Sequence, residues 1–111
     1  MSPTCYIGVM DYEIQTTTVF DKWFSKIKDK STKYRLEARL SRLTKGNFGD
    51  ATTVANHLFE LRFFFGSGFR IYYTLMDENI VLLLCGGDKP TQCTDIEQAK
   101  ELLEKLNKRP S

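Results

Sequence analysis

Three basic side chains stand in and beside a predicted β-hairpin, at positions suited to phosphate chemistry. Arg62 and Arg70 lie in its two arms, around the turn Gly66-Ser67-Gly68, and Lys89 follows the next apolar run. Strand parity puts Arg62 and Arg70 on one face if the hairpin has no bulge. If the three strands are neighbours, the cations converge on one anion, and a guanidinium group binds two phosphate oxygens at once. We therefore expect phosphate chemistry here, most plausibly on RNA.

Basic residues are concentrated in the first half of the chain. The net charge is only +2, but residues 22–45 hold nine lysines and arginines against two acidic residues. Arg35, Arg39 and Arg42 recur at helical spacing and form a basic stripe beside an apolar one. Such a stripe favours a polyanionic partner. A solvated helix face rich in basic residues is the alternative interpretation.

Composition predicts one soluble domain over residues 1–111. Hydrophobic residues make up 41% of the chain and charged residues 27%, which is typical of globular proteins. No apolar run reaches the ~18 residues that span a bilayer, and the first residues lack a signal-peptide pattern, so we expect a cytoplasmic protein without membrane contact. Cys5, Cys85 and Cys93 form no paired motif and His57 is the only histidine, so we expect no disulfide framework, metal site or cofactor.

Hydrophobic spacing predicts three helices. The first begins at the cap Thr18, the second covers about 32–45 after the cap candidate Ser31 and ends before Gly46, and the third opens with the capping box Thr94-Asp95-Ile96-Glu97. The first two helices form a hairpin. The third ends near residue 107.

Strands are predicted between these helices. Part of residues 6–15 alternates loosely and is expected to be a strand, and residues 58–64, 69–76 and 80–85 form an antiparallel meander. Residues 46–56 are predicted to be a loop. The run Val81-Leu82-Leu83-Leu84 has no polar alternation, which predicts a central strand covered on both faces. The order of elements predicts an α+β domain.

A set of ordered motifs spans residues 20–106, about four-fifths of the chain. They are Phe20-x-x-Trp23, Arg39-Leu40-x-Arg42-Leu43, Gly46-Asn47-Phe48-Gly49-Asp50, Glu60-Leu61-Arg62, Gly66-x-Gly68-Phe69-Arg70-Ile71-Tyr72 and Leu83-Leu84-x-Gly86-Gly87-Asp88-Lys89-x-x-Gln92-x-x-Asp95-Ile96. With these motifs the chain resembles the RelE/ParE superfamily of bacterial toxins, and most of all its HigB-like branch of addiction module killer proteins.

The resemblance implies a fold and a function. The expected α+β, RelE-like fold packs an N-terminal helical hairpin on a curved antiparallel sheet, with a C-terminal helix. The expected activity is that of a toxin that enters the ribosomal A site and cuts mRNA without a metal, which inhibits translation. The expected partner is a helix-turn-helix antitoxin that blocks the toxin, in a complex that often binds operator DNA and represses its own operon.

Residue roles follow from the resemblance. Cleavage by the neighbouring 2′-OH needs a base, stabilisation of the phosphorane charge and an acid for the leaving oxygen. Arg70 matches the family arginine and is expected to stabilise charge. Arg62 lies where the RelE type has basic residues on the preceding strand, and Lys89 is the candidate acid or second phosphate contact. His57 is the candidate base, because the late tyrosine of the RelE type is missing. The candidates for RNA contact are Arg35, Arg39, Arg42, Tyr72 and Gln92.

Other interpretations remain open at this point. Arg62 could form a structural ion pair with Glu60, and Arg70 could pair with Asp88 or Asp95. The ParE branch poisons DNA gyrase without catalysis, so a gyrase inhibitor is one alternative function. A non-catalytic RNA- or ribosome-binding module is another.

Overall fold

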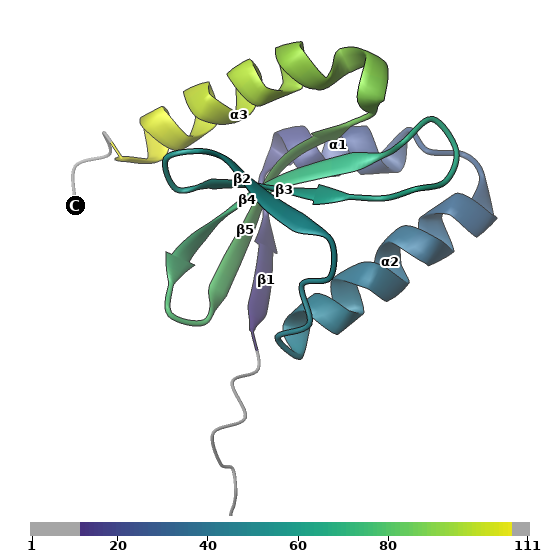
Figure 1. Ribbon diagram of the computed structural model, residues 1–111, viewed down its shortest axis with the longest axis horizontal. Helices are drawn as coiled ribbons and strands as arrows, with labels where there is room; N and C mark the ends of the chain where they lie inside the picture. The colour runs from purple at the N-terminus through teal and green to yellow at the C-terminus, as the bar shows by residue number, and fades with distance from the viewer. Residues whose placement is uncertain (1–11, 108–111) are drawn as a thin grey trace, which may run out of the picture.

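Helices cover both faces of a five-stranded sheet (Figure 1). The computed structural model describes residues 12–107, and of Asp77 and Asn107 it describes only the backbone. The strands are β1 (Glu13–Thr16), β2 (Ala51–Ala55), β3 (Leu58–Arg62), β4 (Arg70–Asp77) and β5 (Ile80–Gly87). The helices are α1 (Thr18–Ser25), α2 (Lys30–Thr44), the 3-10 turn η1 (Lys89–Thr91) and α3 (Gln92–Asn107).

The strands lie in the order β1-β5-β4-β3-β2. All neighbours are antiparallel except β1, which pairs parallel to β5. The predicted α+β class, with its helical hairpin and C-terminal helix, is confirmed. Of the strand predicted within 6–15, residues 13–15 belong to β1, and residues 6–11 and Cys5 lie outside the described residues.

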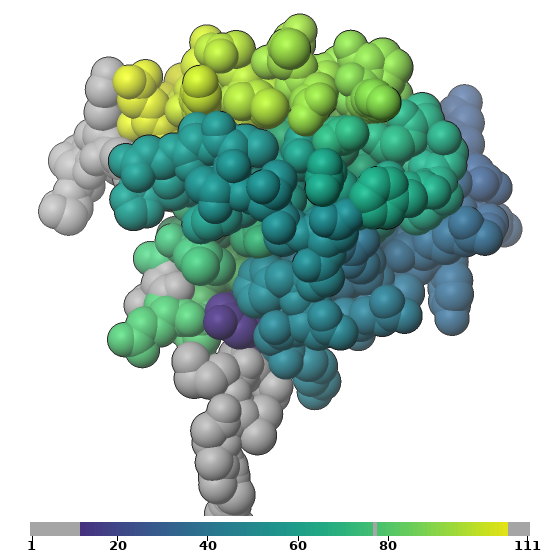
Figure 2. Space-filling model, in the orientation of Figure 1, coloured from purple at the N-terminus to yellow at the C-terminus, as the bar shows by residue number. Residues whose placement is uncertain are grey.

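Two apolar cores hold the layers together, one on each face of the sheet. On the face covered by α1 and α2 the buried residues are Phe20, Leu36, Leu43, Leu61, Phe63, Ile71, Tyr73, Val81 and Leu83. Under α3 they are Leu58, Tyr72, Leu82, Leu84, Cys85 and Ala99. Every residue of β5 after Ile80 is buried, so the prediction of a central, doubly covered strand is confirmed. Figure 2 shows α3 packed along the upper side of the strands in the same view.

The first two helices begin earlier than their predicted caps. Thr17, not Thr18, caps α1, because its hydroxyl oxygen accepts from Phe20 N at 3.1 Å and donates to Leu84 O at 2.6 Å. Asp29, not Ser31, caps α2 by accepting from Thr32 N. Two polar residues near each start are able to cap, and the tertiary packing selects between them. The predicted end of α2 is confirmed, since Gly46 follows the C-cap with a φ of +86°.

The third helix also begins before its predicted capping box. It opens at Gln92, directly after the turn η1, and the capping box is formed instead by Asp88 and Thr91. Pro90 suits the first turn of a helix, because it has no N–H to leave unpaired. No helix within residues 12–107 has the length and apolar character needed to cross a membrane.

Strand β2 occupies part of the segment predicted as a loop. Its sequence, Ala-Thr-Thr-Val-Ala, is short and has exposed threonines at its centre. It lies at the edge of the sheet and pairs only with β3, with a bulge near its end. Pairing with β3, rather than a local apolar pattern, makes this segment a strand.

Candidate functional site

The hairpin of β3 and β4 places Arg62 directly opposite Arg70. Phe63 N donates to Phe69 O at 2.9 Å, so the adjacent Arg62–Arg70 pair is a non-hydrogen-bonded one, in which facing side chains lie closest together. The predicted sharing of a face is confirmed, since the register from 59 to 62 contains no bulge. Like charges directly opposite each other are unfavourable, so each arginine needs its own counter-charge.

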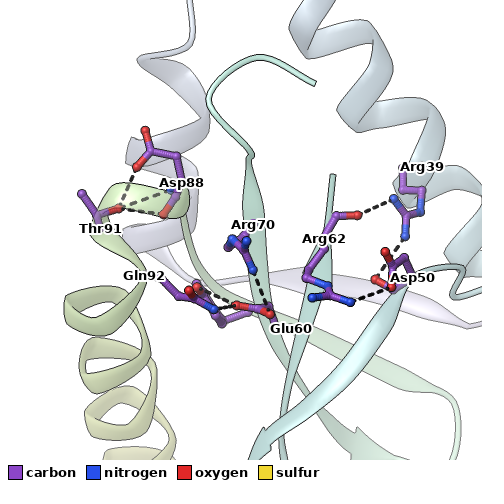
Figure 3. Close-up of polar contacts among 9 residues, drawn as sticks. Arg39, Asp50, Glu60, Arg62, Arg70, Asp88, Thr91 and Gln92 are labelled. Atoms are coloured by element: carbon purple, nitrogen blue, oxygen red, sulfur yellow. Dashed lines mark hydrogen bonds and ion pairs between the residues drawn. The ribbon is translucent and has the colours of Figure 1, made fainter. Parts of the chain in front are cut away.

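Glu60 supplies the counter-charge for Arg70. Its carboxylate is 2% exposed, and Oε1 lies 3.2 Å from Arg70 Nη1, while Arg70 itself is 12% exposed. The other oxygen, Oε2, accepts from Tyr72 OH at 3.1 Å and from Gln92 Nε2 at 2.8 Å (Figure 3). These partners offset the cost of burying a carboxylate. The network ties β3, β4 and the first residue of α3 into one unit.

Asp50 supplies the counter-charge for Arg62. The Arg62 Nη2–Asp50 Oδ1 distance is 3.3 Å, and both side chains are partly exposed. The structure thus pairs Glu60 with Arg70 and Asp50 with Arg62, in place of the pairings considered from the sequence. Glu60 could have been recognised as a partner of Arg70, because the residue opposite it is Tyr72 and Arg70 is the diagonal neighbour.

In both arginines the Nε–H donor has no partner within residues 12–107. The Nε atoms of Arg62 and Arg70 are buried and have no hydrogen-bond partner among the described residues. A buried N–H without a partner is costly, and such groups usually have an explanation in function or in an absent ligand. Two guanidinium groups on facing strands also place fixed positive charge side by side, which suits an anion such as a phosphate diester. The geometry defines this pair as a candidate phosphate site.

The loop that carries Lys89 lies against the hairpin turn. Lys89 N is 3.4 Å from Ser67 O, and a Cβ on Gly68 would lie 3.4 Å from Lys89 Cβ. Gly66 and Gly68 both have positive φ, which the tight turn requires. The Lys89 side chain is exposed. The structure therefore brings the loop of Lys89 to the tip of the hairpin, while Arg62 and Arg70 lie just below that tip.

Hydrogen bonds brace this loop at the start of α3. Thr91 Oγ1 donates to Asp95 Oδ2 at 2.5 Å and lies 3.0 Å from Asp88 Oδ1. The Asp95 carboxylate fills the space that a side chain on Gly87 would need. Burial raises the pKa of Asp95, and the bond from Thr91 partly opposes that rise. The bracing fixes the backbone on which Lys89 and Gln92 stand.

His57 lies at the opposite end of β3. It occupies the turn between β2 and β3 with a φ of +60°, and its carbonyl accepts from Thr74 Oγ1 at 2.6 Å. It stands five positions before Arg62, which corresponds to ~16 Å of extended strand. It borders a cavity of about 260 Å³ that is otherwise lined by Thr74, Leu75, Met76, Leu103 and Leu106. The structure does not bring the candidate base to the arginine pair.

Tyr72 and Gln92, which were predicted as RNA contacts, both bond to Glu60 inside the fold. Tyr72 is fully buried under α3, which leaves no ring face for a base and corrects the prediction that it stacks on RNA. Burial raises its pKa strongly, and the nearby charge of Glu60 raises it further. Gln92 is partly buried and bonded to Glu60, so it supports the arginine site from α3.

Arg39 also has a structural role. Its guanidinium donates to Arg62 O at 2.8 Å and to Phe48 O and Asp50 O at 3.4 Å each, and it covers the Phe63 ring. Burial lowers its pKa. It joins α2 to the start of β2 and the end of β3, so it has a structural role, and its predicted contact with RNA stays a prediction. Arg35 and Arg42 are exposed.

No group of three or more His, Cys, Asp or Glu side chains in residues 12–107 is arranged to hold a metal ion. Cys85 is buried and Cys93 exposed.

Three solved structures that share this fold are a RelE toxin and two RelBE toxin–antitoxin complexes. A variant of the E. coli toxin RelE in the free state superposes with a TM-score of 0.66 and 17% identity, over 87% of this chain and 99% of that chain. The RelBE2 toxin–antitoxin complex of Mycobacterium tuberculosis gives 0.56 and 18%, over 71% and 99%. The intact E. coli RelBE complex gives 0.54 and 16%, over 70% and 96%. The fold is therefore RelE-like.

Sequence comparison identifies the family. The model of the phage derived protein Gp49-like family (DUF891) matches residues 22–107. An uncharacterized protein of Haemophilus influenzae is 47% identical over 97 residues, which cover 87% of this chain and 98% of that protein. The chain belongs to the Gp49-like family, a RelE/HigB-type toxin family, and the resemblance seen in its motifs is confirmed.

Proposed function

We propose that this protein is the toxin of a toxin–antitoxin module and acts as a ribosome-dependent endoribonuclease that cuts mRNA without a metal. The facing pair of Arg62 and Arg70 on the hairpin carries the proposal. The pair offers fixed positive charge to a phosphate diester. Such donors accelerate a reaction most when they stabilise the charge that develops in the transition state.

In the proposed reaction, Arg70, Arg62 and Lys89 have different roles. The 2′-hydroxyl of the message gives its proton to solvent water, and its oxygen attacks the neighbouring phosphorus. Arg70 stabilises the phosphorane charge, because Glu60 holds its guanidinium in place. Arg62 binds a second phosphate oxygen. Lys89 gives a proton to the leaving 5′-oxygen, so the products are a 2′,3′-cyclic phosphate and a 5′-hydroxyl. Gln92 supports Glu60 from α3.

The partner in this proposal is a small antitoxin with a helix-turn-helix. Two of the structurally similar proteins are toxin–antitoxin complexes, which supports a partner of this kind. The antitoxin neutralises the toxin in the cytoplasm, where its target is, and the complex binds its own operator DNA. Rescue of growth by co-expression of the candidate antitoxin tests this part of the proposal.

Mapping of messages in cells that express the toxin tests the cleavage. We expect primer extension to find new ends within translated regions, and these ends should vanish when the start codon of the message is removed. Arg62→Ala should reduce the cuts about 100-fold or more, because one charge donor is lost. The same change at Arg70 also leaves Glu60 without its counter-charge, so Arg62→Ala is the safer variant for folding. Lys100→Ala, an exposed change on α3, is the charge control.

Three outcomes separate the candidate functions. Intact messages in arrested cells would overturn the proposed cleavage. If a DNA damage response and stalled supercoiling accompany those intact messages, the protein inhibits gyrase. Unimpaired growth without any antitoxin would indicate a non-catalytic RNA- or ribosome-binding module.

A further inference from the structure

A groove between α2 and the chain just beyond β3 combines arginines with aromatic rings. Its volume is about 260 Å³. We name it the arginine–aromatic groove, after the residues Tyr34, Arg35, Arg42, Phe63, Phe64 and Phe65, with Ala38 and Arg39 between them. None of these lining residues is acidic. The groove is therefore complementary to negative charge.

Two aromatic side chains at this groove are unusually exposed. Tyr34 is 73% exposed and Phe64 77%, more than any other large hydrophobic residue in the described part of the chain. The guanidinium of Arg35 lies 5.1 Å from the centroid of Phe65, and that of Arg39 lies 4.9 Å from the centroid of Phe63. Tyr34 and Phe64 are thus the rings with open surface, and exposed aromatic surface of this kind marks interaction sites.

Phe64 links the groove to the candidate phosphate site. The Arg62 guanidinium lies 5.9 Å from the centroid of the Phe64 ring, and Arg62 faces Arg70 across the hairpin. The backbone pairing beside β3 ends where Arg62 N donates to Asp50 O at 3.0 Å, so β2 does not pair with the chain beyond Arg62. A strand of RNA held at Arg62 and Arg70 has a direct route over Phe64 into the groove.

We propose that the arginine–aromatic groove binds the single-stranded message next to the scissile phosphate. Bases stack on Phe64 and Tyr34, and Arg35 and Arg42 contact phosphates. Unpaired RNA offers planar bases and one negative charge per nucleotide, which match both features of the groove. An acidic peptide would match the charge, but it gives no reason for open rings beside a phosphate site. The inference rests on the proposed function, since the cleavage site supplies the message.

Binding of a fluorescein-labelled U12 oligonucleotide, followed by anisotropy, tests the groove. Cleavage is proposed to need the ribosome, so U12 stays intact. We expect Tyr34→Ala and Phe64→Ala each to raise Kd about 5- to 100-fold and to leave its salt dependence unchanged, because stacking carries no charge. Phe64→Tyr should restore binding. Arg42→Ala should weaken binding and reduce the slope of log K against log salt by about 0.7.

Met76→Ala is the matched control, because Met76 is an exposed apolar residue beside His57, at the far end of the sheet. Its Kd should stay within about twofold of wild type. Unchanged affinity in both aromatic variants would overturn the proposal, as would absence of U12 binding at low salt. Capture of an acidic, leucine-containing peptide in place of U12 would assign the groove to a protein partner.

The groove proposal and the cleavage proposal can fail independently of each other. If U12 binds through Tyr34 and Phe64 but messages remain intact in cells, the cleavage proposal fails and the groove stands. If messages are cut and the aromatic variants bind U12 with wild-type affinity, only the groove proposal fails.

Discussion

Arg70 Nη1 lies 3.2 Å from Glu60 Oε1, and the Glu60 side chain is almost completely buried. The arginine of β4 is therefore held by a carboxylate of β3, which is itself bonded to Tyr72 and to Gln92 at the start of α3. An arginine fixed in this way needs little reorganisation when a phosphate arrives, which is the property that makes charged donors effective in catalysis.

The first prediction concerns this buried ion pair. Glu60→Ala should lower the free energy of unfolding by about 3–5 kcal/mol, because it leaves Arg70 as an uncompensated buried charge. The double variant Glu60→Ala/Arg70→Met should cost less than the sum of the single changes. Urea denaturation of all four proteins measures the coupling. Additive effects of the two changes would show that the pair contributes no coupling.

The second prediction separates Arg39 from its neighbour on the basic stripe. Arg39→Ala should lower stability by about 2–4 kcal/mol, since three carbonyl oxygens lose a charged donor. Arg42→Ala, one turn later and exposed, should stay within about 0.5 kcal/mol. Arg39→Lys should recover little of the lost stability, because an ammonium group lacks the planar, forked set of donors of a guanidinium group. Thermal unfolding measures each variant, and equal losses for Arg39→Ala and Arg42→Ala would contradict the structural role.

The third prediction concerns Gly86 on the central strand. A Cβ at this position would overlap the Trp23 ring of α1. Gly86→Ala should therefore lower the free energy of unfolding by about 1–3 kcal/mol. In a Trp23→Ala background the same change should be nearly neutral, because the ring that it meets is gone. Urea denaturation of the double-mutant cycle measures this dependence, and an equal cost in both backgrounds would rule out the overlap.

The fourth prediction is a loss of stability at alkaline pH. Burial raises the pKa of the Cys85 thiol to about 12, from an ordinary value of 9.0. Above pH 9 the unfolded chain loses the thiol proton while the folded chain keeps it. The folded state then binds more protons, so the free energy of unfolding falls as pH rises, by up to about 1.4 kcal/mol per pH unit. Burial raises the pKa of Tyr73 to about 12, which extends the loss above pH 10.

Urea denaturation between pH 8 and pH 11 measures this loss. Cys85→Ala should make the fall above pH 9 shallower, whereas Cys93→Ala, at an exposed cysteine, should leave the slope as it is. An identical slope in wild type and Cys85→Ala would show that another group causes the loss.

Much of the fold could be predicted from the sequence because it depends on local patterns. The apolar spacing of α1 and α2, the glycines of the hairpin turn and the apolar run of β5 all act within one element. Strand β2 could not be predicted, since its residues become a strand only by pairing with β3. Helix starts were displaced by a few residues for a similar reason, because several polar residues near each start are able to cap it.

In the candidate site, too, some features follow from local patterns and others from tertiary packing. Parity along β3 and β4 determined that Arg62 and Arg70 share a face, because alternation is a property of the strand itself. Only the tertiary structure decided that Glu60 and Asp50 neutralise them, that Arg39 and Tyr72 are structural, and that His57 lies far away. The ion-pair partners and the burial of a side chain depend on which elements pack together. Elements that pack together in the folded protein are separated in the sequence, so local patterns do not predict them.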